Sequence, residues 1–234
     1  MRGIDVSHWQ GKIDWKKVAD SGIEFVIIKA MHEGTLEPDV EFKRNYDEAG
    51  KYGLKRGVYI FTGNTGIQNP EKEAKAFLKI LDGRKLEMGI WFDFEHQNLA
   101  KAGKAKIEDI AYKYKQIFEG YSCGVYTNMN WYKNILPDSV RCIFKLWVAR
   151  YPANDRGIMA YSLNPKDVVK NSIGWQFTTK GRVDGINGNV DIDEFWEMPA
   201  EAEPKAPEIY VVCVHEYRPI RERGASDCWW IWHS

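Results

Sequence analysis

The sequence predicts an α/β fold, a TIM-like barrel of about eight strands and five helices, with a small C-terminal β-hairpin extension. Short strand-like runs alternate with amphipathic stretches of helical length, a pattern typical of a mostly parallel sheet. Eight such strands are enough to close a barrel, and 234 residues are enough to bury its core. An open doubly wound sheet is the alternative.

The first half of the chain shows the alternation most clearly. A buried strand at residues 3–7 precedes a helical pattern in which Ile13, Trp15 and Val18 share one face. Further strands are predicted at residues 25–28, 57–61, 89–93 and 124–127. Longer helices are predicted at residues 39–52, 70–81 and 106–118, with Pro70 in a first turn and Gly53 and Gly83 at helix ends.

After residue 130 the pattern changes. A short helix at residues 131–135 leads to strands at residues 145–149, 174–178 and 190–195, with little room for full crossover helices between them. This completes the count of eight strands and about five helices. We assign residues 1–198 to the barrel domain.

The C-terminal part differs in composition. Residues 199–207 form a Pro-rich, charged stretch, which predicts a semi-rigid linker. Two strand-like runs within residues 208–234 predict a hairpin that is too small to bury a core alone. It is expected to dock on the barrel, to bind a polymeric ligand, or to form a homodimer with a second copy. Cys213 and Cys228 could bridge its arms, although synthesis in reducing cytosol favours free thiols.

Charge and hydropathy narrow the function classes. Lys+Arg and Asp+Glu are both 33, giving a formal net charge of zero, so a nucleic-acid partner is not expected. No run approaches the roughly 20 apolar residues that cross a bilayer, so no membrane insertion is expected. The N-terminus shows no signal peptide. The cysteines and histidines show no metal-ligand spacing, and we expect no metal and no cofactor.

A pair of acids at the end of the fourth strand is the strongest chemical signal. In a barrel of this kind the reacting groups lie at the carboxyl ends of the strands. Asp93 and Glu95 are two residues apart, so they point to the same side, toward the barrel mouth. Repulsion and the apolar neighbours Trp91, Phe92 and Phe94 would raise the pKa of one of them. An acid beside an ionised carboxylate is the equipment of a glycosidase, and this short spacing favours retention over inversion.

Two further acids belong to the same site if the barrel closes. Asp5 in the first strand and Asp191 in the last interrupt apolar runs, and those strands would be neighbours. The alternative for each is a local turn or cap contact. Asp193 lies on the same face as Asp191, and spacing alone does not choose between them.

These motifs resemble a known family. The segments GIDVS, DFE, GVYTN, LWVARY, WQF and VD occur in the order found in family 25 glycoside hydrolases, over residues 3 to about 196. The resemblance implies a retaining β-1,4-N-acetylmuramidase that cuts bacterial peptidoglycan between N-acetylmuramic acid and N-acetylglucosamine, on a barrel of eight strands and five helices. It identifies Glu95 as the acid/base, Asp93 as the second carboxylate, and Asp5 and Asp191 as supporting acids.

The resemblance also bears on substrate binding and localisation. Sugars stack on aromatic rings, so we expect a groove of aromatic and amide side chains. The candidates are Tyr59, Tyr126, Trp147, Tyr151, Trp175 and Gln176. Each could instead be a core residue, and Gln176 could satisfy a buried neighbour. A wall substrate without a signal peptide suggests an endolysin of phage or prophage, made in the cytoplasm and acting on the cell wall after release.

Rival hypotheses remain open at this point. A family 18 chitinase is disfavoured, because Met88 and Trp91 stand where its motif requires acids. A wall-binding barrel without useful catalysis is possible, although the intact Asp93 and Glu95 argue against it. A third hypothesis makes the C-terminal hairpin an oligomerisation or adhesion module. The segment Lys29-Ala30-Met31-His32-Glu33-Gly34 is one residue longer than its counterpart in the family.

Overall fold

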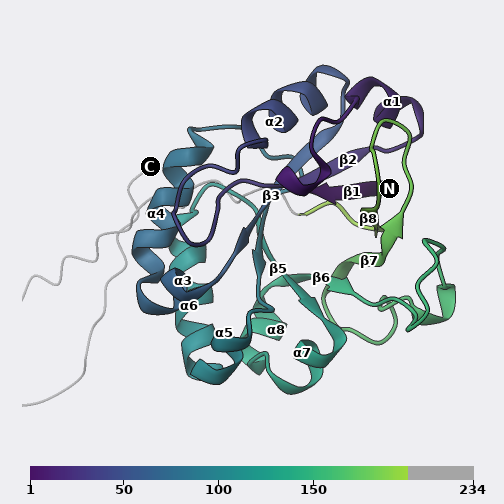
Figure 1. The fold of residues 1–234 in the computed structure, drawn as a ribbon. Coiled ribbons are helices and arrows are strands. Elements are labelled where there is room, and N and C mark those ends of the chain that lie inside the picture. The colour runs from purple at the N-terminus through teal and green to yellow at the C-terminus, as the bar shows by residue number, and fades with distance from the viewer. Residues whose placement is uncertain (200–234) are drawn as a thin grey trace, which may run out of the picture.

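A computed structural model of the chain describes residues 1–199. The predicted hairpin at residues 208–234, the predicted homodimer and all but the first residue of the predicted linker lie outside these residues. Eight strands close into a barrel in chain order, with β1 beside β8, as Figure 1 shows. The strands are β1 (Arg2–Val6), β2 (Phe25–Lys29), β3 (Lys55–Phe61), β4 (Ile90–Asp93), β5 (Cys123–Asn128), β6 (Lys145–Ala149), β7 (Ser172–Gly181) and β8 (Val190–Phe195).

Strand direction changes once around the barrel. Strands β1 to β7 run parallel to one another. Strand β8 pairs antiparallel with both β7 and β1. The short chain between β7 and β8 leaves no room for a crossover helix, so β8 must return in the opposite direction. The predicted closed and mostly parallel barrel is therefore confirmed, with one antiparallel closing strand.

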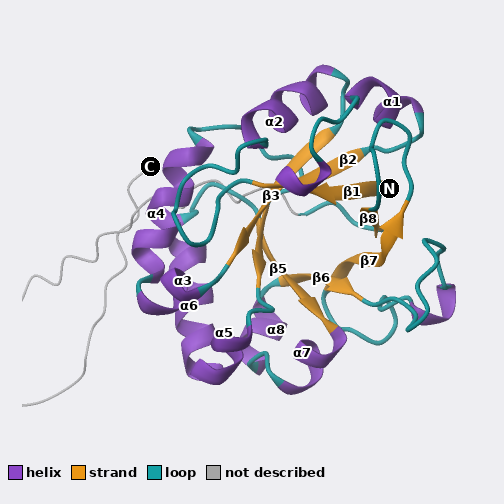
Figure 2. Cartoon of the chain, in the orientation of Figure 1, coloured by secondary structure: helices purple, strands orange, loops and turns teal. Residues whose placement is uncertain are grey.

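Helices surround most of the barrel, whereas the connections between β6 and β8 are mainly loops (Figure 2). The α-helices are α1 (Trp15–Asp20), α2 (Phe42–Lys51), α3 (Asn64–Gln68), α4 (Pro70–Leu81), α5 (Gln97–Ala102), α6 (Lys104–Ile117), α7 (Met129–Asn134) and α8 (Asp138–Ile143). Two short 3₁₀ turns are η1 (His8–Gln10) and η2 (Tyr161–Leu163).

The described residues thus contain eight α-helices instead of the expected five. The additional three are α3, α5 and α8, each of five or six residues. Such short helices do not complete two turns, so they show no hydrophobic period in the sequence. Helix α4 has the predicted bounds, because Pro70 fits its first turn and the Asn69 side chain accepts the Lys72 N–H as a cap.

The barrel interior is filled by large side chains. Trp91 makes edge-to-face contacts with Trp147 and Phe195, at ring-centre distances of 5.8 and 5.4 Å. Gly124 on β5 allows this packing, since a Cβ there would lie 2.4 Å from the Trp91 ring. A second apolar layer lies between the sheet and the helices. The packed interior excludes water below the barrel mouth and forms the floor of the site described next.

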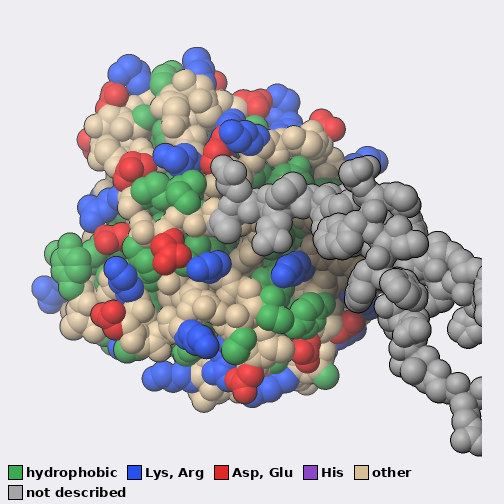
Figure 3. Space-filling model, turned by 180° about the vertical axis from the view of Figure 1, so that it is seen from behind, with side chains coloured by type: hydrophobic (Ala, Val, Ile, Leu, Met, Phe, Trp, Pro, Cys, Tyr) green, Lys and Arg blue, Asp and Glu red, His purple; other side chains and the backbone are tan. Residues whose placement is uncertain are grey.

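The surface carries charges of both signs. Seen from behind, basic and acidic side chains are interspersed over the described part of the molecule (Figure 3). Within residues 1–199, no helix is both long and apolar enough to cross a bilayer.

Candidate active site

Three strands bring four acidic side chains to one end of the barrel. Asp5 lies on β1, Asp93 is the last residue of β4, Glu95 follows two residues later, and Asp191 lies on β8. They share a cavity of about 110 Å³. Its lining consists of Asp5, Tyr59, Asp93, Glu95, Tyr126, Trp147, Gln176 and Asp191. The four acids that we predicted from the sequence therefore meet in one place.

Successive side chains of β4 point alternately into the barrel and out toward the helices. Trp91 belongs to the interior cluster and Asp93 lines the cavity above it. Phe92 and Phe94 belong instead to the layer beneath the helices. They keep water from the outside of the strand, but only Trp91 lies below the carboxylates. Glu95 is exposed at the open side of the cavity, whereas Asp93 is buried.

The reversed direction of β8 places Asp191. Asp5 and Asp191 are directly paired residues of the antiparallel β1–β8 ladder. Asp191 lies near the amino end of β8, and only an antiparallel β8 brings that end to the carboxyl end of β1. Asp193 also faces inward but lies deeper, where its Oδ1 accepts the Trp147 Nε1–H at 2.9 Å. Asp191 therefore lines the cavity, and Asp193 supports its wall.

Burial and mutual repulsion raise the pKa values of these acids. Burial raises the pKa of Asp93 well above its usual range, and the charges of Glu95 and Asp5 add to this effect. Burial also raises the pKa of Glu95. The pKa of Asp191 is raised to about 6, first by burial and then by Glu95. Neighbouring carboxylates that interact in this way titrate as a group.

Asp193 is affected in the same way. Burial and the charges of Asp5 and Asp191 raise its pKa well above the usual range. Its Oδ2 is buried and faces no donor group. The contact between Asp193 and Asp5 raises the pKa of Asp193 and lowers the pKa of Asp5 against the effect of burial.

Gln176 joins two sides of the cavity. Its Nε2 donates to Asp5 Oδ2 at 2.8 Å, and its Oε1 accepts from the Tyr126 hydroxyl at 2.9 Å. Both ends of the amide are thus used within the protein. We expected Gln176 to bind sugar hydroxyls or to satisfy a buried neighbour, and the structure favours the second role. It holds Asp5 and Tyr126 in place.

The predicted aromatic residues separate into three groups. Tyr59, Tyr126 and Trp147 line the cavity. Tyr151 lies at the rim and is 43% exposed. Its pKa is raised mainly by burial and further by the charges of Glu95 and Asp191. Trp175 is fully buried on the outer face of β7, packs against Phe177 and donates from Nε1 to the Arg150 carbonyl.

The assignment of Trp175 to the sugar groove therefore needs correction. Adjacent residues of a strand point to opposite sides. Gln176 faces inward, so Trp175 must face outward into the layer around the barrel.

Lys29 is a cation beside the acids that was not predicted from the sequence. Lys29 ends β2, its side chain is 12% exposed, and its Nζ donates to Glu33 Oε2 at 2.9 Å. The Lys29 charge lowers the pKa of Asp93 and so favours its ionised form. A lysine that ends an apolar strand was the available signal, because such a position faces the mouth.

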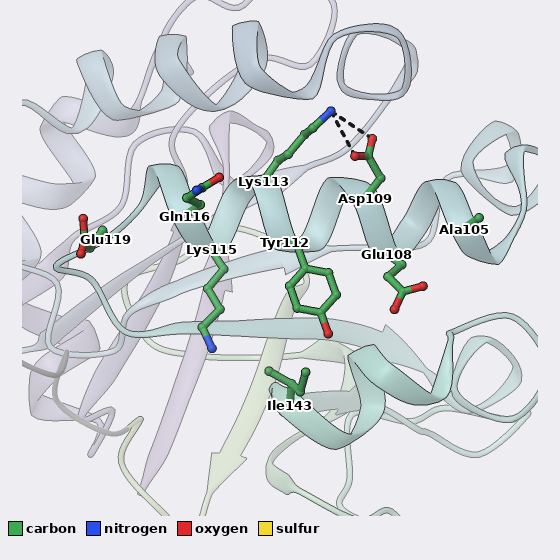
Figure 4. Close-up of a pocket in the computed structure, with 9 residues that line it drawn as sticks. All are labelled: Ala105, Glu108, Asp109, Tyr112, Lys113, Lys115, Gln116, Glu119 and Ile143. Carbon is green, nitrogen blue, oxygen red and sulfur yellow. Dashed lines mark hydrogen bonds and ion pairs between the residues drawn. The ribbon is translucent and has the colours of Figure 1, made fainter. Parts of the chain in front are cut away.

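A larger hollow lies elsewhere and carries no comparable chemistry. It is an open depression along the outer face of α6, where Tyr112 stands beside Ile143 of α8 (Figure 4). Lys113 pairs there with Asp109 at 3.0 Å, a contact between helix surface residues. The small cavity at the barrel mouth is the candidate active site, because among the hollows of residues 1–199 it is the one that gathers several buried acids with raised pKa values.

Paired carboxylates at the mouth of such a barrel are typical of a glycosidase. The comparison with known families agrees with this class. The chain belongs to family 25 of the glycosyl hydrolases, whose model matches residues 4–186.

Individual relatives extend the comparison. An autolytic lysozyme of Clostridium acetobutylicum is 33% identical over 202 residues, covering 84% of this chain and 56% of that protein. The crystal structure of the CTP1L endolysin has a TM-score of 0.67 and 29% identity, over 83% of this chain and 66% of that one. The autolysin LytC of Streptococcus pneumoniae, solved with a synthetic peptidoglycan ligand, has a TM-score of 0.67 and 26% identity, over 82% and 46% of the two chains. The chain thus spans about half the length of some relatives.

Proposed function

We propose that this protein is a lysozyme that cleaves the β-1,4 bond between N-acetylmuramic acid and N-acetylglucosamine in bacterial peptidoglycan, with retention of configuration. The observation that carries the proposal is the position of Asp93 and Glu95, which lie two residues apart at the carboxyl end of β4 and line one cavity. Family membership and the peptidoglycan bound to LytC support the choice of substrate.

Glu95 is the residue best suited to donate the proton. It stands at the open side of the cavity, where a glycosidic oxygen can approach, and burial raises its pKa, which favours the protonated form that a proton donor needs. The same group then takes a proton from the water that completes hydrolysis.

Asp93 is suited to act as the second carboxylate. It lies deeper than Glu95, burial raises its pKa, and the Lys29 charge acts in the opposite direction and partly offsets this effect. An ionised Asp93 either attacks the sugar carbon directly or orients the N-acetyl group for internal attack, and both routes retain configuration. Asp5 and Asp191 surround this centre with further negative charge, which stabilises the positive charge that develops on the sugar ring.

The place of action follows from the substrate. We propose synthesis in the cytoplasm and access to the wall after release, as expected for an endolysin, a class to which one of the similar structures belongs. The predicted homodimer through residues 208–234 stays a prediction.

The test is wall hydrolysis by the purified protein, with mass spectrometry of the new reducing ends and proton NMR of the first anomer formed. We expect muramic acid at the reducing end in the β configuration. Glu95→Gln should lose most of this activity, about a hundredfold or more, because it removes the titrating proton and keeps the shape. Glu108→Gln, on the outer face of α6, is the matched control and should retain activity.

Two other outcomes would contradict the proposal. Release of N-acetylglucosamine reducing ends would change the bond that is cut. Binding of walls without sugar release from several wall types would favour the wall-binding barrel.

A further inference from the structure

The candidate active site is small for its proposed substrate. Its cavity of about 110 Å³ lies below the range of roughly 300–1,000 Å³ that is usual for small-molecule sites. A glycan strand that reacts there must rest most of its length on surface outside the cavity. We therefore searched the rim of the barrel for side chains that could hold a sugar.

Trp9 is the most exposed large aromatic side chain at the rim. It belongs to η1, which follows β1 and Asp5 directly, and it is 81% exposed. The Trp9 ring lies beside the His8 ring, with centres 4.8 Å apart. Leaving an indole in water forfeits the free energy of burying it, so an exposed ring beside a site is a candidate contact for a ligand.

The turn that carries Trp9 is held in place. Ser7 Oγ accepts the Trp9 N–H, and Gln10 Oε1 accepts the Ser7 N–H, which together form a capping box. Arg44 of α2 donates to the Gly11 carbonyl at 2.9 Å just beyond the turn. A platform that is already ordered loses little conformational entropy when a ligand binds it.

His8 is oriented by a buried acid. Asp39 Oδ2 lies 2.6 Å from His8 Nδ1, and the Asp39 side chain is 1% exposed. Asp39 Oδ1 accepts the Glu41 N–H. The contact with Asp39 uses Nδ1 of the ring, so Nε2 is the atom that can form a hydrogen bond with a hydroxyl group of a ligand.

A hollow of about 220 Å³ adjoins this pair. Its lining includes His8, His32, Pro38 and Val40, and Val40 is 85% exposed. The hollow lies on the segments that follow β1 and β2, and His8 comes three residues after Asp5, which lines the active-site cavity. Asp39 also lies close enough to Tyr59 that its charge contributes to raising the pKa of that cavity residue.

We propose that Trp9, with His8 and the hollow beside it, forms a distal subsite that binds a hexosamine ring of the glycan strand outside the bond that is cleaved. The Trp9 indole covers one face of the ring, and His8 Nε2 forms a hydrogen bond with a sugar hydroxyl. The inference rests on the proposed function, since it extends the groove of the same glycan substrate.

The test compares short and long fragments. Binding of a muramic acid–glucosamine disaccharide and of a peptidoglycan octasaccharide is measured by calorimetry in the Glu95→Gln background, which prevents cleavage. Trp9→Ala should weaken octasaccharide binding by about threefold to tenfold, the value of one aromatic contact, and leave disaccharide binding unchanged. Trp9→Phe should restore most of the loss. Tyr112→Ala, which removes an exposed ring on α6, should change neither value.

The outcomes separate this inference from the proposed function. Suppose that the wild type cleaves peptidoglycan, but that Trp9→Ala leaves the affinity for both fragments unchanged or lowers both affinities equally. The subsite is then wrong and the lysozyme proposal stands. If the wild type cleaves no wall and the Glu95→Gln variant binds neither fragment, the proposed function fails and the subsite fails with it. Thermal unfolding of Trp9→Ala should match the parent, because the side chain is exposed.

Discussion

Asp5 and Asp191 face each other as a directly paired couple across β1 and β8, although they come from opposite ends of the described chain. Two carboxylates opposite each other in an antiparallel ladder repel, and burial increases the cost. The fold tolerates this arrangement because Gln176 donates to Asp5, and this hydrogen bond and the contact with Asp193 both lower the pKa of Asp5 against the effect of burial. Such stored repulsion is typical of a site that acts on a developing positive charge.

The two inward-facing acids of β8 should differ in function. Asp191→Asn removes a negative charge that lines the cavity and should lower kcat by at least about tenfold. Asp193→Asn should keep activity within a few fold, because Asp193 does not line the cavity and an amide oxygen can still accept from Trp147 Nε1. Wall hydrolysis measured on both variants decides this. A larger loss for Asp193→Asn would reverse the assignment.

The pKa of Asp191 should depend on Glu95. The Glu95 charge is the second cause, after burial, that raises the pKa of Asp191 to about 6. Replacing Glu95 with Gln removes this repulsion, so ionised Asp191 becomes easier to form and its pKa should fall below that value. A carbon-13 NMR titration of the Asp191 carboxyl group measures the change. The Glu108→Gln variant should leave the titration as in the wild type, and an unchanged pKa in Glu95→Gln would show that burial acts alone.

Glu73 should make stability depend on pH. It is buried between α3, α4 and α6, where Tyr114 donates to Oε2 and Oε1 lacks a partner, and burial raises its pKa from 4.5 to about 7. Between these pH values the unfolded chain loses the proton and the folded protein keeps it. Stability from Glu73 is therefore fully present below pH 4.5 and lost as the pH rises through 7, by up to about 3 kcal/mol.

The variant Glu73→Gln isolates this contribution. It cannot ionise, so its melting temperature should rise relative to the wild type between pH 5 and pH 8, measured by calorimetry. At pH 5 the variant should be the less stable protein, because the amide N–H₂ has no partner at the Oε1 position. Glu71→Gln, in the exposed first turn of the same helix, is the control and should follow the wild type at each pH. A constant difference between Glu73→Gln and the wild type would contradict the prediction.

Gly124 should be essential for packing inside the barrel. A Cβ at this position would lie 2.4 Å from the Trp91 ring and 3.0 Å from the Lys145 carbonyl. Trp91 has little freedom to move, because its Nε1 donates to the Met88 carbonyl at 2.8 Å. Gly124→Ala should therefore lower the free energy of unfolding by about 1–3 kcal/mol, measured with urea. Gly34→Ala should be nearly neutral, since its added Cβ would have only ordinary contacts, and similar losses in both variants would rule out the packing argument.

The sequence by itself determined the approximate positions of the strands and the acid pair at the end of β4. Hydrophobic runs and their alternation are local properties, so they located all eight strands and placed Asp93 and Glu95 on one side of β4. The motif order also identified the family, which the family model confirms. Of the five helices with five or six residues, α1 and α7 were predicted, whereas α3, α5 and α8 escaped detection, because helices with so few turns show only a weak hydrophobic period and are held by contacts with the rest of the barrel.

Only the tertiary structure decided which side chains of each strand point into the barrel and which point out toward the helices. Alternation requires that Trp175 and Gln176 point in opposite directions, but the side that faces the barrel interior depends on the register with β6 and β8. The antiparallel direction of β8 placed Asp191 at the mouth and Asp193 below it. The contacts of Asp39 with His8 and of Gln176 with Asp5 join segments far apart in the chain, and such contacts exist only after the barrel has closed.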